Sequence, residues 1–598
     1  MKKAKRMPPT EELHPFDVHY ITTPSQEELR KLAVEHSLAC WETKYGGINK
    51  ITRNKARFAK YTYIVAPDED AHLYAGKTIA PEKAMEYIQR VWDFIHLKGK
   101  LIDIQGYYGL GEHVFPMQWF YTLQAANLAG MQQTLSFSRE DVETPEQLAG
   151  PYKPVIRLVM VPDLPATGMP DDMAMIVDLD NYTTYVIGAD YFGESKKGAL
   201  RMLNEYVYQM GGLVLHAGAK AVTVGDNRLT MTILGLSGTG KTTTTFSKQG
   251  ELTQPIQDDM VCVWPGGSIS ITENGAFAKT FGLTEEAEPI IWDGTRSPTA
   301  WIENGYYDNE GTFDPFKQPL SVEDVKKLRE ELVMTGAPMA NVDAYIKGEV
   351  ALEDKVDENM IPDDGWDFLV WTQNGRSIFP LSAIPGVPDL NTIPPMLSMG
   401  MLNRDEGPDA AFPGIIRFKN LEQAAAYFML GETTKTSAAG KDRGRIRSPF
   451  TQPFFPRAMG LQAVRFAELA KDIDGLGTWM MNTGWVGGDA NDVERGTALK
   501  VKIRHSSAML ETMLRDEIVW KEDPDFGYLI ADIDHPDNAP LLEKVPKEIL
   551  NPVVLFEEQG RMDVYRAWVK MMLTQRKEFL LGLNVADIIS DQIPACKE

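Results

Sequence analysis

The sequence predicts a mixed α/β (α+β) fold in two domains, the second of which carries a nucleotide-binding loop. The chain has 598 residues, more than one ordinary hydrophobic core organises. Between residues 172 and 264, strand-like apolar runs separated by short turns flank a segment of helical periodicity. Residues 235–242 read GLSGTGKT and fit the phosphate-loop pattern GxxxxGK[ST] at every fixed position. We expect domains at 1–222 and 223–598.

The loop at residues 235–242 is suited to surround phosphate groups. Its successive main-chain N–H groups can point at phosphate oxygens, and glycines leave room for that approach. The run LTMTIL at 229–234 predicts a strand that leads into the loop, and residues 242–246 can open a helix whose N-terminal dipole attracts phosphate. Lys241 would reach the outer phosphates, and Thr242 would bind Mg²⁺. The residues therefore predict a nucleoside triphosphate site.

Composition and charge exclude several classes of protein. The chain is 43% hydrophobic and 24% charged, as in soluble globular proteins. A formal charge of −23 argues against a broad nucleic-acid or anionic-membrane surface. Cys40, Cys262 and Cys596 give neither a disulfide framework nor a CxxC metal spacing. The basic start MKKAKR is followed by PPTEE, and no run approaches 18 apolar residues, so we expect a cytoplasmic protein.

Cations gather before the loop in two places. Residues 51–60 (ITRNKARFAK) precede a strand-like run and suit an anionic ligand, although a solvated charged face is the alternative. Lys196 and Lys197 precede a helix whose apolar positions recur from 199 to 210, so we expect both at its N-terminus. Cations are disfavoured there, which makes the pair notable, although a plain surface pair is equally possible.

Other polar side chains lie close to the loop in sequence. His216 is expected on a strand, where a histidine is usually a core residue. Asp258 and Asp259 stand beside an apolar strand after the loop, in the manner of a Walker-B acid.

Peripheral segments complete the expected organisation. We predict helices at 25–36, where Ser25 and Glu28 form a capping box, and at 563–583. Residues 294–366 read as an insertion with a helix at 321–334, and the basic stretch 433–456 is a candidate lid or a plain exposed loop.

The order of these motifs resembles that of the ATP-dependent phosphoenolpyruvate carboxykinases from about residue 15 to the C-terminal helices. GLSGTGKTT is identical to the family's kinase loop, and RFAKYTYIV, from residue 57, is similar to its RSPKDKYIV. YFGESKKG at 191–198 is similar to YGGEMKKG, His216 falls on the histidine of HCSANV, and Asp258 and Asp259 fall on GDD. Further matches are AKT at 278–280, EAEP at 286–289, NGR at 374–376 and NTGW at 482–485. The resemblance implies a two-domain carboxykinase-like fold.

The same resemblance implies the reaction. Oxaloacetate and ATP would give phosphoenolpyruvate, CO2 and ADP reversibly, as a step of gluconeogenesis or anaplerosis. Mn²⁺ held by Lys197, His216 and Asp259 would stabilise the enolate and bridge it to phosphate. Lysine binds a metal only as the neutral amine, so positive charge from Lys196, the metal and a helix N-terminus is expected to lower the pKa of Lys197.

The resemblance also assigns the substrate and nucleotide contacts. Arg57 would bind the substrate carboxylate through its planar fork, Arg376 would lie over the transferring phosphoryl group, and Tyr191 would line the substrate or CO2 pocket. Asp258 would assist Thr242 in holding Mg²⁺ through water. The implied nucleotide-binding residues are Gly235, Leu236, Ser237, Gly238, Thr239, Gly240, Lys241, Thr242, Thr243 and Glu288. Residues 495–504 are the candidate adenine-binding stretch.

Two other functions are compatible with the loop. A phosphotransferase for another small carboxylic acid or a hydroxyl could use the same scaffold, although a hydroxyl kinase would need an acceptor-side Asp base and no lysine-bound metal. A catalytically inactive nucleotide-binding regulator would not need Lys197, His216 and Asp259 together. We expect no nucleic-acid or membrane partner, and a monomer or small homo-oligomer.

Overall fold

The computed structural model divides the chain into two compact units, each assembled from separate stretches of sequence. Unit 1 comprises Met1–Gln209, Ile271–Pro385 and Pro453–Arg457, and unit 2 comprises Met210–Ser270, Gly386–Gln452 and Ala458–Glu598. The predicted domains, 1–222 and 223–598, are continuous and differ from this division, because the strands of 275–380 pair with strands near the N-terminus. Within these units the structure describes residues 17–53, 59–236, 239–280, 283–286, 288–307, 313–314, 322, 326, 329, 339–349, 375–435, 444–452 and 454–596.

The large sheet of unit 1 is mixed, with the strand order β1-β6-β7-β8-β10-β9-β4-β5. Its strands are β1 (His19–Thr22), β4 (Thr62–Val65), β5 (Lys77–Ile79), β6 (Lys100–Tyr108), β7 (Phe115–Tyr121), β8 (Ile156–Val161), β9 (Ala174–Asp178) and β10 (Thr183–Ile187). The unit's helices are α2 (Gln26–His36), α3 (Pro81–Lys98), α4 (Ala126–Leu135), α5 (Arg139–Val142), α6 (Pro145–Leu148), α7 (Phe192–Gln209), α9 (Pro289–Thr295) and α11 (Met339–Ile346).

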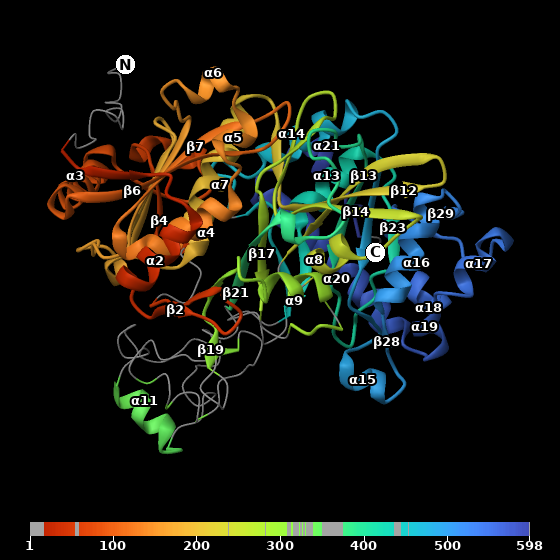
Figure 1. Cartoon of the computed structure of the whole chain (residues 1–598). Helices are drawn as coiled ribbons and strands as arrows, with labels where there is room; N and C mark the ends of the chain where they lie inside the picture. The colour runs from red at the N-terminus through yellow and green to blue at the C-terminus, as the bar shows by residue number, and fades with distance from the viewer. Residues whose placement is uncertain are drawn as a thin grey trace. The chain divides into compact units, whose positions relative to one another are not determined.

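Helices cover both faces of this sheet. Val159 packs in one core cluster with Ile88 and Trp92 of α3. Its neighbour Leu158 contacts α7 at Gly198. Because successive residues of a strand point to opposite faces, α3 and α7 lie on opposite sides of the sheet, as Figure 1 also shows.

A second sheet of unit 1 joins segments that are far apart in the sequence. Its order is β17-β21-β18-β3-β2, with β2 (Cys40–Glu42), β3 (Ile48–Lys50), β17 (Gly275–Lys279), β18 (Trp301–Glu303) and β21 (Arg376–Pro380). A hairpin of β19 (Tyr306–Tyr307) and β20 (Phe313–Asp314) follows β18.

Unit 2 is built on another mixed sheet, with the order β14-β12-β13-β22-β26-β23-β30-β29. The unit's strands are β11 (Leu213–Leu215), β12 (Ala217–Val224), β13 (Asn227–Gly235), β14 (Leu252–Asp258), β15 (Val261–Val263), β16 (Ile269–Ile271), β22 (Met396–Asn403), β23 (Ile415–Arg417), β24 (Glu432–Lys435), β25 (Gly444–Arg447), β26 (Gly477–Asn482), β27 (Trp485–Val486), β28 (Leu499–Lys500), β29 (Trp520–Glu522) and β30 (Leu529–Ala531). Its helices are α8 (Lys241–Phe246), α13 (Leu421–Leu430), α14 (Leu461–Lys471), α15 (Ala490–Glu494), α16 (Ile503–Leu514), α17 (Ala539–Leu542), α18 (Lys547–Leu550), α19 (Val553–Glu558), α20 (Met562–Gly582) and α21 (Asp587–Ser590).

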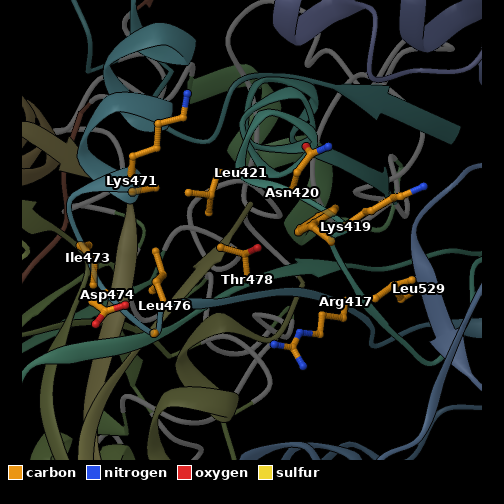
Figure 2. Close-up of a pocket in the computed structure, with 13 residues that line it drawn as sticks. Arg417, Lys419, Asn420, Leu421, Lys471, Ile473, Asp474, Leu476, Thr478 and Leu529 are labelled. Atoms are coloured by element: carbon orange, nitrogen blue, oxygen red, sulfur yellow. The ribbon is translucent and has the colours of Figure 1, made fainter.

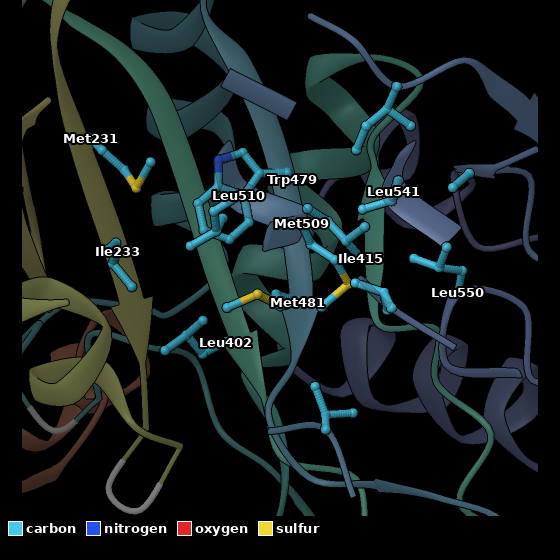
Figure 3. Close-up of a cluster of buried hydrophobic side chains, with 14 of the residues drawn as sticks. Met231, Ile233, Leu402, Ile415, Trp479, Met481, Met509, Leu510, Leu541 and Leu550 are labelled. Atoms are coloured by element: carbon cyan, nitrogen blue, oxygen red, sulfur yellow. The ribbon is translucent and has the colours of Figure 1, made fainter. Parts of the chain in front are cut away.

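The core of unit 2 fixes the central strands. Met231 of β13, Leu402 of β22 and Trp479 of β26 pack in one cluster with Met509 and Leu510 of α16 (Figure 3). β13, β22 and β26 are parallel, so their carboxyl ends lie at one edge of the sheet. Ligands of open α/β sheets bind at that edge.

Several predicted elements are confirmed. α2 begins after Ser25, whose side chain accepts a hydrogen bond from the N–H of Glu28. β13 leads to the loop, α8 follows it, and α20 occupies the predicted C-terminal helix. The predicted helix at 321–334 and most of the insertion lie outside the described residues.

Two predicted placements were wrong. α7 begins at Phe192, so Lys196 and Lys197 are its fifth and sixth residues rather than its N-terminus. The apolar run started the predicted helix too late, because the first turn contains Gly193, Glu194 and Ser195. His216 is not within a strand but between β11 and β12, where the chain passes from one sheet to another.

Candidate functional site

The phosphate-loop sequence lies at the carboxyl edge of the unit 2 sheet. β13 ends at Gly235, which pairs with Leu402, and α8 begins at Lys241. Gly240 caps the helix with φ +86°, a conformation that a residue with a Cβ rarely adopts. The strand, turn and helix therefore follow each other as the sequence predicts. Ser237, Gly238 and the side chain of Thr242 lie outside what the structure describes.

The segment after β26 holds the loop in place. Thr483 Oγ1 donates to the main-chain oxygen of Thr239 at 2.8 Å and lies 3.2 Å from that of Asn403. Asn482 is fully buried, and its side-chain oxygen accepts the N–H groups of Asp405 and Gly484. The NTGW motif thus joins the ends of β22 and β26 to the loop. The sequence pointed to this motif only through family resemblance.

α8 packs directly on β12. A Cβ at Gly218 would stand 2.1 Å from Thr245 Oγ1, so glycine is required for this close approach. Lys220, two residues along the strand, is fully buried beneath the end of the helix. Its Nζ donates to the main-chain oxygens of Thr244 at 2.5 Å and Ser247 at 3.1 Å, and to the Gln249 side chain. Lys220 therefore caps the carboxyl end of α8, where carbonyl groups lack helical partners.

We expect Lys220→Met to destabilise this region. The substitution leaves the buried acceptors of Thr244 and Gln249 unpaired, at about 1–3 kcal/mol each when water cannot replace the donor, so a total loss of about 2–6 kcal/mol is expected. Burial lowers the pKa of Lys220 to about 7, yet a neutral amine still donates to two of these oxygens. Urea unfolding measures the loss, and Lys248→Met, at an exposed lysine, is the matched control. Equal stability of the two variants would contradict the capping role.

His216, Asp259 and Lys241 meet beside the start of α8. His216 Nε2 lies 3.0 Å from Asp259 Oδ1, and Lys241 Nζ lies 2.7 Å from the same oxygen. Asp259 follows the end of β14, which pairs with β12, and His216 immediately precedes β12. The structure thus brings together two of the three predicted metal ligands and the loop lysine, all within unit 2.

The arrangement of His216 fits a metal ligand. Its Nδ1 lies 3.0 Å from the main-chain oxygen of Phe450, to which an Nδ1–H can donate. When Nδ1–H donates to this oxygen, Nε2 is the ring nitrogen that can bind a metal, as in many metal-binding histidines. Among the described residues, no group of three or more His, Cys, Asp and Glu side chains clusters as a metal site. The predicted metal ligands Lys197, His216 and Asp259 include a lysine, so they would not count as a cluster of those four residue types.

A second cationic cluster borders the same sheet edge. Lys500 Nζ lies 3.5 Å from the centre of the Trp485 ring and donates to the main-chain oxygen of Thr483 at 3.0 Å. Arg404 Cζ lies 4.8 Å from the same ring. Burial, and then the charge of Arg404, lower the pKa of Lys500 to about 8. Lys500 lies within the stretch 495–504 proposed for the adenine.

The predicted substrate residues that the structure describes lie in unit 1. Tyr191 is buried next to the start of α7, Lys197 is partly buried, and Arg376 begins β21. Arg376 Cζ lies 5.6 Å from the ring of Phe277. Glu288, predicted to bind nucleotide, also belongs to unit 1, at the N-cap of α9. Arg57 and the side chain of Asp258 lie outside the described part.

Lys196 occupies an environment that the sequence did not predict. It is 2% exposed, with Nζ 3.3 Å from Glu273 Oε2 and 4.9 Å from the centre of the Phe277 ring. The carboxylate offsets its charge, which weakens the expectation that Lys196 lowers the pKa of Lys197.

The basic stretch 433–456 is anchored by ion pairs. Arg445 contacts Asp405 and Asp409, each at 3.0 Å, and Arg447 contacts Glu432 at 2.8 Å. The sequence left open whether this stretch is a lid over phosphates or a plain exposed loop; the two arginines of β25 are paired with carboxylates. Residues 436–443 lie outside the described residues.

A cavity of about 480 Å³ lies elsewhere on unit 2 and contains none of the predicted site residues. Arg417, Lys471 and Thr478 are among the residues that line it (Figure 2). Thr478 is near the start of β26, whereas the phosphate-loop edge is at its end. Arg417 and Lys471 pair with Asp516 and Glu422. The cavity is therefore separate from the candidate site.

The fold and this edge define a mixed α/β protein with a phosphate-loop sequence between strand and helix. A model of the family described as phosphoenolpyruvate carboxykinase matches residues 18–324 and 350–535. The chain belongs to the ATP-dependent phosphoenolpyruvate carboxykinase family. Residues 325–349, inside the predicted insertion, fall outside the match.

Curated relatives carry the name phosphoenolpyruvate carboxykinase (ATP). The protein of Bradyrhizobium sp. (strain ORS 278) is 25% identical over 549 residues, covering 88% of this chain and 87% of that protein. The protein of Rhizobium rhizogenes is 26% identical over 452 residues, 73% of this chain and 70% of that protein. The protein of Geobacillus thermodenitrificans is 26% identical over 495 residues, with coverages of 80% and 77%. In the described part of the chain, no helix is long and apolar enough to span a membrane.

Proposed function

We propose that this protein converts oxaloacetate and ATP reversibly to phosphoenolpyruvate, CO2 and ADP. The observation that carries the proposal is the meeting of His216, Asp259 and Lys241 beside the start of α8, in a member of the carboxykinase family. The bond between the carboxylate carbon and C3 of oxaloacetate breaks, and its electron pair forms an enolate. The enolate oxygen then attacks the γ-phosphorus, and ADP leaves.

The phosphate loop would bind the triphosphate. Main-chain N–H groups at the start of α8 and the Lys241 ammonium supply positive potential where negative charge accumulates in phosphoryl transfer. Lys241 pairs with Asp259 at 2.7 Å, so a bound phosphate would compete with this carboxylate for the ammonium. Thr483 supports the position of the loop through Thr239.

His216 and Asp259 would hold a divalent metal, for which Mn²⁺ is our proposal. The hydrogen-bond acceptor at Phe450 supports this role because it holds the His216 ring with Nε2 facing Asp259. When bound, the ion supplies Lewis-acid stabilisation of the enolate oxygen. The third proposed ligand, Lys197, belongs to unit 1, and its participation is a prediction. Thr242 and Asp258 are proposed for Mg²⁺.

Residues of unit 1 would bind the organic acid. An arginine fork matches two carboxylate oxygens, the role proposed for Arg57, and Arg376 would stabilise the charge of the transferring phosphoryl group. Tyr191 would line the substrate or CO2 pocket. Three cysteines without a disulfide framework support a cytoplasmic enzyme.

The activity test uses the purified full chain with Mn²⁺, Mg²⁺ and oxaloacetate. We expect phosphoenolpyruvate and ADP to form in equal amounts with ATP, and at least tenfold more slowly with GTP or pyrophosphate. Malate and pyruvate are the comparison acids. Phosphorylation of another acid while oxaloacetate remains untouched would contradict the proposal.

A further inference from the structure

Glu303, the last residue of β18, is fully buried in unit 1. Its Oε1 accepts the main-chain N–H of Phe192 at 2.8 Å, at the start of α7 and directly after Tyr191. In the strand register, Glu303 lies opposite Arg376 on β21 and opposite Lys50 on β3. Glu303 therefore meets the start of α7 through its side chain, and β21 and β3 through its backbone.

Asn304, the next residue, is held in an unusual conformation. It is 2% exposed and has φ +59°, in the left-handed region that residues with a Cβ rarely adopt. Its Oδ1 lies 3.0 Å from the N–H of Thr52 and 3.2 Å from Thr52 Oγ1, and its own N–H donates to the main-chain oxygen of Lys50 at 2.8 Å. Asparagine enters this region more readily than most residues with a Cβ, and here its side chain and main chain are both bonded to the segment 50–52.

Asp190 closes the connection between these segments. The main-chain N–H of Arg53 donates to Asp190 Oδ2 at 2.9 Å, and Lys50 Nζ lies 3.5 Å from the same oxygen. Asp190 immediately precedes Tyr191. The segment 50–53, the start of α7 and the start of β21 are thus joined through residues 303 and 304.

We propose that Glu303 and Asn304 are positioning residues that set Tyr191 for the organic acid and Arg376 for the transferring phosphoryl group. The inference rests on the proposed roles of Tyr191 and Arg376 in the carboxykinase reaction. Neither Glu303 nor Asn304 touches substrate; each acts through the elements it holds. Misplacement of reacting groups by about 1 Å can cost about 100-fold in rate, so loss of the side-chain contacts of Glu303 with the start of α7 and of Asn304 with Thr52 has a large effect.

The chemistry of Glu303 selects the test substitution. Burial raises the pKa of Glu303 most, and the negative charge of Asp190 raises it further. The N–H of Phe192 and the positive charges of Lys50 and Arg376 lower it. The result is a pKa of about 8, so the carboxyl group is largely protonated at neutral pH. Glutamine matches its size and keeps an oxygen that accepts the N–H of Phe192.

The experiment compares Glu303→Ala, Glu303→Gln and Asn304→Gly with the wild-type full chain. We expect Glu303→Ala to lower kcat/KM for oxaloacetate about 10- to 100-fold while KM for ATP changes less than twofold. Glu303→Gln should restore activity to within about threefold of wild type. Asn304→Gly keeps the left-handed backbone available but removes the acceptor of Thr52, and we expect a rise of about tenfold in KM for oxaloacetate.

A purely structural variant separates positioning from stability. Ile88→Ala removes buried side-chain volume from the α3 core cluster and should lower Tm without changing KM for oxaloacetate. If Glu303→Ala is insoluble, the kinetics of Asn304→Gly decide whether this pair positions the substrate residues. Wild-type kinetics for oxaloacetate with Asn304→Gly, or with folded Glu303→Ala, overturns the inference. An inactive wild-type chain would instead refute the proposed function.

Discussion

Replacing Asp259 with asparagine should lower kcat for phosphoenolpyruvate formation about 100- to 1000-fold. Asp259 provides the carboxylate oxygen that contacts both His216 and Lys241, at 3.0 and 2.7 Å. Loss of one preorganised electrostatic group in other enzymes costs about 3–4 kcal/mol of transition-state stabilisation. Asparagine has nearly the same shape as aspartate, so the loss of kcat in Asp259→Asn reports the removal of the negative charge. Steady-state kinetics at saturating Mn²⁺ and ATP measures it.

The matched control is Asp226→Asn, in the exposed turn between β12 and β13 of the same unit. It makes the same chemical change away from the site and should leave kcat unchanged. Lys197→Ala, in unit 1, should show a loss of the same order as Asp259→Asn if both residues hold Mn²⁺. Near-normal kcat in Asp259→Asn would remove the proposed role of this carboxylate.

Replacing Glu432 with glutamine should destabilise unit 2 by about 3–5 kcal/mol, the usual cost of breaking a buried ion pair by changing one partner. Arg576 of α20 is fully buried and donates through Nη2 to Glu432 Oε1 at 2.8 Å. Arg447 donates through Nε to Glu432 Oε2 at 2.8 Å. In the variant, the positively charged side chains of Arg447 and Arg576 would face a neutral amide, with no negative charge between them. The midpoint of urea unfolding, followed by tryptophan fluorescence, measures the loss.

The pH dependence identifies the charge as the cause. Burial raises the pKa of Glu432, but the charges of Arg576 and Arg447 outweigh it and hold the value at about 2, against an ordinary 4.5. A lowered carboxyl pKa contributes stability that is complete above about pH 4.5 and is lost as the pH falls towards 2. The difference between wild type and Glu432→Gln should therefore shrink over that window.

The control for this prediction is Glu522→Gln, which alters an exposed ion pair with Lys419. Exposed pairs contribute about 1 kcal/mol or less, so this variant should unfold close to wild type. A Glu432→Gln variant as stable as Glu522→Gln would show that the buried network does not stabilise unit 2.

The sequence motifs indicated the kind of site better than they indicated where individual residues lie in helices and strands. GLSGTGKT identified the strand, turn and helix from β13 to α8 because backbone conformation there is governed by local glycines and apolar runs. The start of α7 and the position of His216 depended on tertiary packing that no periodicity reveals. The residues around 57, 237 and 258 are described in part or not at all, so their proposed roles stay predictions.

Partners distant in the chain were not predictable. No motif marked Lys220, and only the structure shows that it caps α8. Glu303 and Asn304 gave no signal, since a Glu-Asn pair after an apolar residue is common and their partners are 111 and 252 residues away. The ion pairs of Arg445 and Arg447 could not be predicted, because Asp405 and Glu432 lie 40 and 15 residues earlier in the chain.

The discontinuity of unit 1 has a consequence for biosynthesis. β2 and β3 complete their sheet only with β17, β18 and β21, which end at Pro380. β3 ends at Lys50 and its partner β18 ends at Glu303, so the nascent chain must expose that strand edge until about 250 further residues have left the ribosome. Long-range pairing of this kind slows folding and favours aggregation of the intermediates. A fragment ending near residue 222 should accordingly require chaperone binding to stay in solution, whereas the full chain can bury those edges itself.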